Sequence, residues 1–327
     1  LDNTRLSLYP SSIKSMRVGN SSPPVYRGVS FHCRKRRTTF SCRRTKGTFV
    51  AQSAKVPFLF PVKYMQLIEI IDAIEKIAPL GQAASWDLSG LQVAARRTEV
   101  RSLAVCLDPT PASLAAALAQ GAEMVLSHHP LTLKPTLPNC CNNYHEALRL
   151  LLSADVPLYA AHTSLDVNPH GPAGWLAREL ELNNLCVLEP AAPAQGTELP
   201  PGYGLAGDLP QACSVADLAA RLARRLDLST AVCCGPQATH VRRVAYCTGS
   251  GASLMDAAAQ ADAQLYITGD IKYHAALEAA VCLLDVGHHS LEEEMMRHMS
   301  LLLQQTLTGV AVHFVPSRSP FRPVVFS

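Results

Sequence analysis

The chain has 327 residues, of which 48% are hydrophobic and 17% are charged, and its formal net charge is +3. This composition is typical of a globular protein with a sizeable core, and no apolar stretch reaches the roughly 18 residues that a membrane span needs. The charge is unevenly distributed: residues 1–64 hold thirteen Lys and Arg against one acidic residue, whereas residues 65–327 carry a net charge of −9.

The basic segment, residues 1–64, has three interpretations. An extension with no fold of its own is favoured, because no helix or strand period is visible before about residue 57. An organelle transit peptide comes next, since the segment is rich in Arg and Ser and nearly free of acids. An arm that binds nucleic acid comes last. We therefore expect a cytoplasmic protein, or an organellar one if the segment is a transit peptide.

The cysteines indicate a reducing compartment. There are eleven of them, an odd number, and they are scattered without a Cys-x-x-Cys pair. The vicinal pairs Cys140-Cys141 and Cys233-Cys234 are poorly placed for ordinary disulfides. We expect buried, inert thiols.

Regular patterns begin at Met65, where isoleucines with helical spacing predict an amphipathic helix over residues 65–78. Apolar runs and Ala-rich helical patterns then alternate, which is typical of a parallel α/β sheet. Residues 85–93 lead into a strand, further strands are predicted at 103–107, 124–127 and 156–161, and helices are predicted at 111–120, 145–153 and 172–182.

The segment 189–243 is predicted to be a linker followed by a helix, because residues 189–210 are rich in Pro and Gly. The alternation resumes in residues 244–327, where a capping box at Ser290 predicts a helix from Leu291. The two blocks, 65–188 and 244–327, resemble each other. The predicted fold is therefore α/β: two similar units with largely parallel sheets that face each other across a metal-containing cleft.

The strongest functional signal is the pair His128 and His129, which closes the apolar run 124–127 and is followed by Pro130. Proline stops strand pairing, so both imidazoles are expected at the edge of a sheet. Neighbouring strand residues point to opposite faces, which suggests two metal ions rather than one.

Two other predicted strands end in a histidine with a carboxylate four residues on. One brings His162 and Asp166, and the other brings His288 and Glu292. Imidazole and carboxylate ligands suit Zn, Fe or Mn, and the lack of thiolate ligands argues against a structural zinc finger. Strand ends gather at the carboxyl edge of a parallel sheet, so a shared metal site is expected there.

Five motifs, in this order, resemble those of the NIF-three-like family, whose members are often described as GTP cyclohydrolase I type 2 homologues. They are SWDLSGLQV (85–93), LSHHPL (126–131), HTSLD (162–166), TGDIKYH (268–274) and GHHSLEEE (287–294). The resemblance covers essentially all of residues 65–327. It implies a dinuclear metal protein in the compact form without an inserted domain, assembled as a homohexameric ring.

The resemblance also implies which residues bind the ions. The implied ligands are His128, His129, Asp166, His288 and Glu292, with Glu292 bridging the two ions. His129 and Asp166 would bind one ion, and His128 and His288 the other. The family usually has an aromatic residue where this chain has His289, so the four-residue spacing to Glu292 decides in favour of His288.

Several residues near these motifs have two possible roles. His162 and His274 are candidates for proton transfer, or for orienting ligands. Asp87, Asp108 and Asp270 either orient imidazoles or make turn hydrogen bonds. The Gly249–Gly251 turn either holds a phosphate or is a plain strand-to-helix turn.

Three functions remain open from the sequence. The first is a metal-dependent hydrolase acting on a nucleotide-like or phosphorylated small molecule. The second is a non-catalytic metal carrier, chaperone or regulatory scaffold. The third, a nucleic-acid-binding ring, is disfavoured by the net −9 of residues 65–327.

Overall fold

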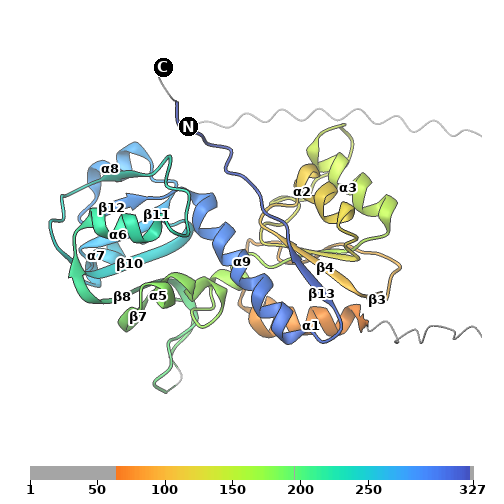
Figure 1. Ribbon diagram of the computed structural model, residues 1–327, viewed down its shortest axis with the longest axis horizontal. Coiled ribbons are helices and arrows are strands. Elements are labelled where there is room, and N and C mark those ends of the chain that lie inside the picture. The colour runs from red at the N-terminus through yellow and green to blue at the C-terminus, as the bar shows by residue number, and fades with distance from the viewer. Residues whose placement is uncertain (1–63, 195, 325–327) are drawn as a thin grey trace, which may run out of the picture. The chain divides into compact units, whose positions relative to one another are not determined.

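The computed structural model describes residues 64–194 and 196–324, which belong to one compact unit. The expectations for the basic segment 1–64 lie outside the described residues, apart from Tyr64. The described part contains a five-stranded and a six-stranded sheet, and the long helix α9 (His288–Thr306) runs between them (Figure 1). The predicted α/β class is confirmed.

The five-stranded sheet has the order β13-β4-β5-β6-β2, and its first three pairings are parallel. Its apolar runs form strands because both faces are covered, as expected for a parallel sheet. Its elements are β2 (Gly90–Val93), β4 (Ser102–Cys106), β5 (Met124–Ser127), β6 (Leu158–Ala160) and β13 (Ala311–Phe314), with helices α1 (Leu67–Ile77), α2 (Pro111–Ala119) and α3 (Asn143–Ala154). Beside it, β1 (Met65–Gln66) and β3 (Glu99–Val100) form a two-stranded pair.

The six-stranded sheet has the order β7-β8-β10-β11-β12-β9 and is mixed. Only β10, β11 and β12 are parallel neighbours, and the outer strands pair antiparallel. Its strands are β7 (Asn183–Pro190), β8 (Gly202–Cys213), β9 (Val232–Cys234), β10 (Val241–Ser250), β11 (Leu265–Gly269) and β12 (Cys282–Asp285). The short helices of this part are α6 (Val215–Leu222), α7 (Met255–Gln260) and α8 (Tyr273–Glu278).

The chain divides between the sheets differently from the predicted boundaries. The expected linker, 189–243, contributes β8, a 12-residue strand that pairs with both β7 and β10. Strand β13, expected in the second unit, pairs in parallel with β4 of the first sheet. The reason is α9, whose 19 residues carry the chain from β12 to the other sheet before β13 begins.

Two predicted helices also differ. Residues 172–182 form a 3-10 turn, η2 (Pro172–Gly174), and a short helix, α5 (Trp175–Glu179), because β7 begins at Asn183. Helix α9 begins at His288 rather than Leu291, so the predicted capping box at Ser290 is wrong. The N-cap is Gly287, whose amide donates to Asp285 Oδ1 at 2.8 Å. The earlier start places His288 and Glu292 one turn apart on one helix.

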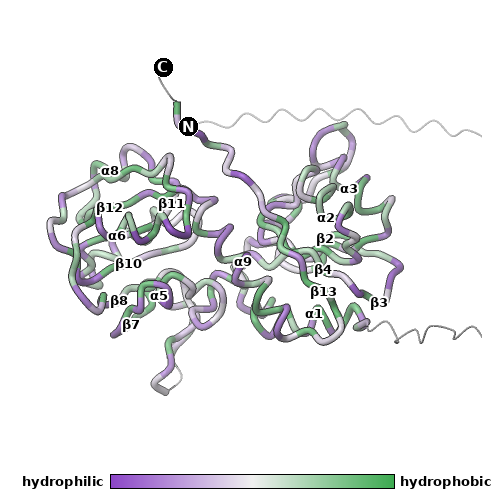
Figure 2. The backbone as a smooth tube through the Cα atoms, viewed as in Figure 1, coloured by the Kyte–Doolittle hydropathy of each residue, from purple (hydrophilic) through white to green (hydrophobic). Residues whose placement is uncertain are grey.

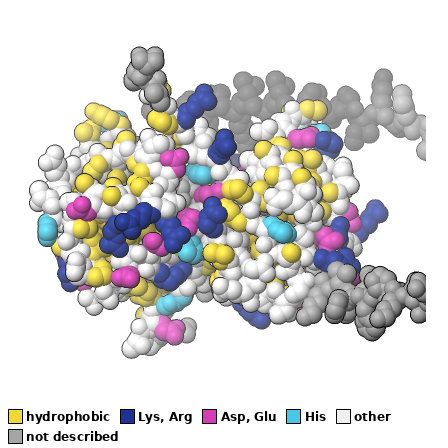
Figure 3. All heavy atoms as spheres, viewed as in Figure 1, with side chains coloured by type: hydrophobic (Ala, Val, Ile, Leu, Met, Phe, Trp, Pro, Cys, Tyr) yellow, Lys and Arg dark blue, Asp and Glu magenta, His cyan; other side chains and the backbone are white. Residues whose placement is uncertain are grey.

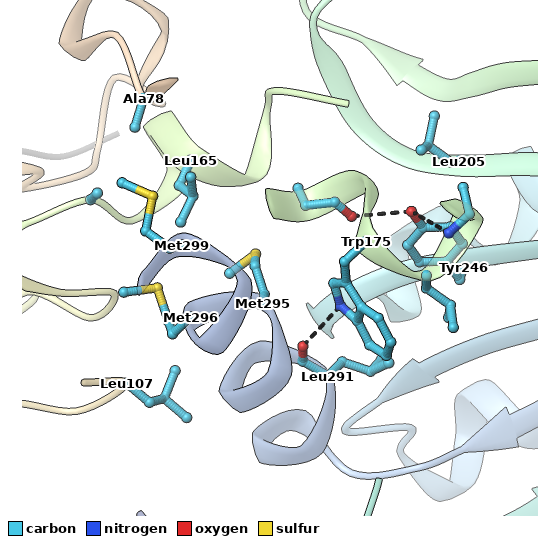
Figure 4. Packing of buried hydrophobic residues seen from close by; sticks show 14 of the residues in the cluster. Ala78, Leu107, Leu165, Trp175, Leu205, Tyr246, Leu291, Met295, Met296 and Met299 are labelled. Carbon is cyan, nitrogen blue, oxygen red and sulfur yellow. Dashed lines mark hydrogen bonds between the residues drawn. The ribbon is translucent and has the colours of Figure 1, made fainter. Parts of the chain in front are cut away.

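One hydrophobic core joins the two sheets. Leu103 and Val105 of β4 belong to the same buried cluster as Leu265 and Ile267 of β11. Figure 4 shows the methionines of α9 on one side of this cluster and Tyr246 on the other, with Trp175 against the helix. Figure 2 shows hydrophobic residues concentrated along the strands of both sheets. This shared core fixes α9, and with it the side chains that α9 carries.

No helix in the described ranges is long and apolar enough to cross a membrane. The cysteines among the described residues are all free thiols, but they are not all buried as expected. Cys140 and Cys141 lie exposed in the loop before α3, and Cys233 is exposed on β9, an edge strand. The prediction of uniformly buried thiols is therefore wrong.

Candidate metal centre

Three segments deliver the predicted ligands to one place. His128 and His129 directly follow β5, and His162 follows β6 just before the short helix α4 (Thr163–Asp166). Because β5 and β6 are parallel neighbours, these ends meet at the same sheet edge. His288 and Glu292 come from the first turns of α9.

Glu292 is the centre of the cluster, and its side chain is buried. His288 Nε2 lies 2.8 Å and His129 Nε2 lies 3.2 Å from its Oε2 atom. His128 Nε2 lies 3.5 Å from Oε1, and the same nitrogen is 3.7 Å from Asp166 Oδ1. All five predicted ligands therefore come together in the structure.

Each imidazole is oriented by a partner on its Nδ1 atom. His128 Nδ1 lies 2.9 Å from the carbonyl oxygen of Ala161. A carbonyl only accepts, so His128 Nδ1 must carry the proton and Nε2 keeps a free lone pair. This is the usual arrangement of a histidine that binds a metal.

Carboxylates orient the other three imidazole rings through their Nδ1 atoms. His129 Nδ1 donates to Asp108 at 2.7 Å, and His288 Nδ1 donates to Asp270 at 2.7 Å. His162 Nδ1 donates to Asp87 at 2.8 Å. The structure thus supports orientation of imidazoles for all three aspartates, and Asp87 also makes the alternative turn hydrogen bonds, to Leu88 and Ser89.

The pKa shifts follow from this packing. Burial alone would lower the pKa of His129, but Asp108 and Glu292 raise it to about 10. Glu292 is the main cause of a pKa of about 9 for His288. Burial would raise the pKa of Glu292, yet the surrounding imidazoles hold it well below its usual value. Burial raises the pKa of Asp166. The cluster therefore favours a positive charge next to Glu292.

The donor set fits a metal ion. Three buried atoms of the cluster make no hydrogen bond of regular geometry among the described residues, although two of them are only 2.8 Å apart: His128 Nε2, His288 Nε2 and Glu292 Oε2. Unpaired buried polar atoms are costly, so they call for a cation. Ligand atoms of His129, His288 and Glu292 lie within 4.8 Å of one another, as do those of His128, His129 and His162. Nitrogen and oxygen donors of this kind suit Zn, Fe or Mn.

The distances group the ligands differently from the division that the resemblance implied. His128 lies with Asp166 on the Oε1 side of Glu292, whereas His129 and His288 lie on the Oε2 side. The implied pairing of His129 with Asp166 is therefore not supported. His128 and His129 diverge because His128 turns towards Ala161 and His129 towards Asp108.

Gly249, at the end of β10, makes room for Glu292. Its φ of +63° favours glycine, and a Cβ atom there would collide with Glu292 Oε1. In the next turn, the Gly251 amide donates to Thr268 Oγ1 at 3.0 Å. That amide is therefore not free to hold a phosphate, and the role of the rest of the Gly249–Gly251 turn stays a prediction.

A cavity of about 800 Å³ opens beside the cluster. Its wall includes the predicted residues His129, His162, Asp166, His288 and Glu292. It also includes residues that sequence reasoning did not assign to a site: Trp86, Leu131, Leu133, Glu189, Tyr203, Thr248 and Leu254. Of these, Trp86 lies within the motif SWDLSGLQV and Leu131 within LSHHPL, so these two had a sequence signal.

Two other histidines lie apart from the cluster. His274 is exposed on α8 and is not part of the cavity wall, so its predicted role in proton transfer stays a prediction. His289 Nε2 lies 2.9 Å from Ser317 Oγ, away from the ligands. That contact agrees with the choice of His288 over His289.

The fold and the site together define a two-sheet α/β protein with a buried His/carboxylate cluster able to hold metal. The chain belongs to the family described as Duf34/NIF3 (NGG1p interacting factor 3), whose model matches residues 65–320. The family resemblance read from the five motifs is thus confirmed.

Similar proteins from distant organisms support this family assignment. A GTP cyclohydrolase 1 type 2 homolog of Streptomyces coelicolor is 33% identical over 236 residues, covering 69% of this chain and 81% of the relative. The NIF3-like protein 1 of Drosophila melanogaster is 27% identical, covering 76% of this chain and 86% of the relative.

Solved structures share the fold. A hypothetical protein of Staphylococcus aureus has a TM-score of 0.72 at 25% identity, with 80% of this chain and 99% of that chain covered. A Bacillus cereus protein related to NIF3 has a TM-score of 0.71 at 23% identity, with 81% and 100% covered.

Proposed function

We propose that this protein binds two divalent metal ions and acts as a metal-dependent hydrolase on a nucleotide-like or phosphorylated small molecule. The observation that carries the proposal is the convergence of imidazole Nε2 atoms on both oxygens of Glu292, in the wall of a cavity of about 800 Å³. A metal cluster beside a cavity of this size is the usual arrangement of a catalytic site.

His128, Asp166 and Glu292 Oε1 would hold one ion, and His129, His288 and Glu292 Oε2 the other. When bound, such a pair of ions lowers the pKa of water towards neutrality and stabilises an anionic substrate oxygen. Asp87 holds His162 by its Nδ1 atom, which leaves Nε2 free to accept or donate a proton at the cavity wall. We assign proton transfer to His162 for this reason.

The names of the relatives make GTP the first substrate to test. Purified protein loaded with Mn, Fe or Zn should release formate from GTP, and Glu292→Gln should abolish the release. Glu278→Gln is the matched control, because Glu278 is exposed on α8, outside the cavity wall. If no metal supports turnover of GTP or of a broad metabolite panel, the hydrolase proposal fails.

The second candidate is a non-catalytic metal carrier, chaperone or regulatory scaffold. The burial of His128 and Glu292 favours the scaffold version of this candidate, since deeply held ions exchange slowly with solvent and would serve a structural role. A carrier would pass its ions to a metal-free acceptor protein without turning over any metabolite. A hydrolase would instead keep its ions through many turnovers.

Assembly and location complete the proposal. We propose a homohexameric ring in the cytoplasm, or in an organelle if residues 1–64 act as a transit peptide. Light scattering on the purified protein measures the mass of the assembly, and fractionation of cells locates it. Nucleic acid is not favoured as a partner, because basic and acidic side chains are interspersed on the face drawn in Figure 3.

A further inference from the structure

The side chain of Trp86 is a large aromatic group that is exposed in the cavity wall. Its side chain is 63% exposed, whereas Trp175, the other tryptophan of the chain, is 1% exposed. A single exposed apolar residue is common on protein surfaces and needs no explanation. An exposed indole beside a buried metal-ligand cluster is different, because large aromatics at cavity walls commonly contact ligands.

The backbone around Trp86 is fixed on both sides. The Ala84 amide donates to Thr163 Oγ1 at 2.9 Å, and the Asp87 amide donates to the Ala84 carbonyl at 2.9 Å. The Asp87 carboxylate in turn accepts hydrogen bonds from His162 and Thr163. The backbone that carries the indole is therefore held in place while the indole stays exposed, so binding a ligand there would cost little ordering of the backbone.

The position of Trp86 relates it to the metal centre. Its ring centroid lies 5.9 Å from that of His162, with an interplanar angle of 77°. The His162 ring centroid in turn lies 5.1 Å from that of His128. A ring stacked on the exposed face of the indole would therefore be separated from the ligand cluster by a single side chain, that of His162.

The rest of the cavity wall supplies apolar contacts and hydrogen-bond acceptors. Leu131, Leu133 and Leu254 line it, and Leu133 is itself exposed. Among the described residues of the wall, the charged groups other than histidine are carboxylates, including that of Glu189. A carboxylate only accepts hydrogen bonds, so this wall favours a ring that carries N–H donors.

We propose that the Trp86 end of the cavity binds a planar nitrogen heterocycle, stacked on the indole, with the reacting part of the molecule directed at the Glu292 cluster. This inference rests on the proposed function and adds the substrate class to it. An anionic group of the same molecule would face the bound metal ions, since the described residues of the wall include no Lys or Arg to receive it.

Tryptophan fluorescence tests the proposal directly, because the buried Trp175 stays shielded from a soluble quencher. The metal-loaded protein is titrated with guanosine, adenosine and pterin, and acrylamide quenching is measured. At least one of the three should protect the indole from acrylamide, and ribose 5-phosphate should not. In Trp86→Phe the ligand-dependent change in quenching should disappear.

Calorimetry measures the contribution of stacking. Trp86→Ala should weaken binding of the protecting heterocycle by roughly fivefold to a hundredfold, the usual effect of removing a stacking partner. Its metal content should equal that of the wild type. Tyr273→Ala is the matched control, because Tyr273 is 72% exposed on α8 but outside the cavity wall. This variant should bind normally.

Three results would overturn the inference. The first is protection by none of the three heterocycles, and the second is equal binding by Trp86→Ala. The third is an indole already shielded from acrylamide in the ligand-free protein, which would mean that a second copy of the chain covers it. Failure of the hydrolase proposal is a separate outcome, because protection of Trp86 is measured without turnover.

Discussion

The indole Nε1 of Trp175 donates a hydrogen bond to the backbone carbonyl of Leu291 at 3.2 Å (Figure 4). Leu291 immediately precedes Glu292 on α9, so a buried side chain of α5 holds the helix where it carries the central carboxylate. The metal centre is thus positioned from the hydrophobic core as well as from the strand ends.

Replacing Trp175 with Phe tests this support. The variant keeps an aromatic ring but loses the N–H donor, so the free energy of unfolding should fall by about 0.5–1.5 kcal/mol. Affinity for Mn or Zn should fall severalfold as the helix loosens. Tyr246→Phe is the control: its hydroxyl donates to the Ala173 carbonyl and accepts from the Ala177 amide, and neither hydrogen bond is made to α9. It should lose stability without losing metal affinity.

Replacing Asp270 with Asn should weaken metal binding roughly tenfold to a hundredfold, because His288 loses the charged partner of its Nδ1 atom. Asn tolerates the positive φ of 59° at this position, so the backbone should not change. Asp262→Asn makes the same exchange at a φ of 60°, away from the cluster. Competition with a chelating dye measures both affinities. Equal affinities in the two variants would refute the orienting role.

Replacing Gly249 with Ala should damage the metal centre. The new Cβ atom would displace Glu292, and the positive φ adds strain of roughly 1–2 kcal/mol. Gly121→Ala separates the backbone strain from the collision. Gly121 has a φ of +79°, but no atom lies within 4 Å of the position that a Cβ atom would occupy. Both variants should lose stability in chemical denaturation, but only Gly249→Ala should lose bound metal. A fully loaded Gly249→Ala protein would show that the contact does not matter.

The stability of the metal-free protein should fall as pH rises from 7 to 10. The pKa values of His129 and His288 are raised from 6.5 to about 10 and about 9. Each imidazolium therefore stabilises the fold fully below about pH 6.5, and this contribution is lost as pH passes through 9 to 10. Urea unfolding of metal-stripped protein measures the trend.

In the metal-stripped Glu292→Gln variant, this loss of stability with pH should be smaller, because the carboxylate that contributes to both raised pKa values is gone while Asp108 and Asp270 remain. Metal affinity should change in the opposite direction and rise with pH, since each imidazole must lose its extra proton to bind. A stability that is constant between pH 7 and 10 in the metal-stripped wild type would contradict this account.

The sequence predicted the elements whose signals are local. Strand β5 begins and ends as predicted, at residues 124 and 127, because an apolar run is bounded there by His128 and Pro130. The fixed order of five motifs predicted the family, and the structure brings together all five implied ligands. Those residues lie at the ends of strands and the starts of helices, and the carboxyl ends of parallel strands meet at the same edge of a sheet.

The pairing of strands that are distant in the sequence was not predicted, for a physical reason. Strand β8 contains three glycines and a proline and has no simple alternation of apolar residues, so it was predicted as part of a linker. It is a strand because β7 and β10 pair with it on both sides. The grouping of ligands around Glu292 was also missed, since it depends on which way His128 and His129 turn.

The most direct test of the dinuclear proposal is the number of metal ions per chain, measured by mass spectrometry of metals after loading with Mn, Fe or Zn and removal of excess. We predict two ions per chain in the wild type, one in His288→Asn, and loss of both in Glu292→Gln. A wild type that binds one ion or none, or a Glu292→Gln variant that keeps both, would contradict the account.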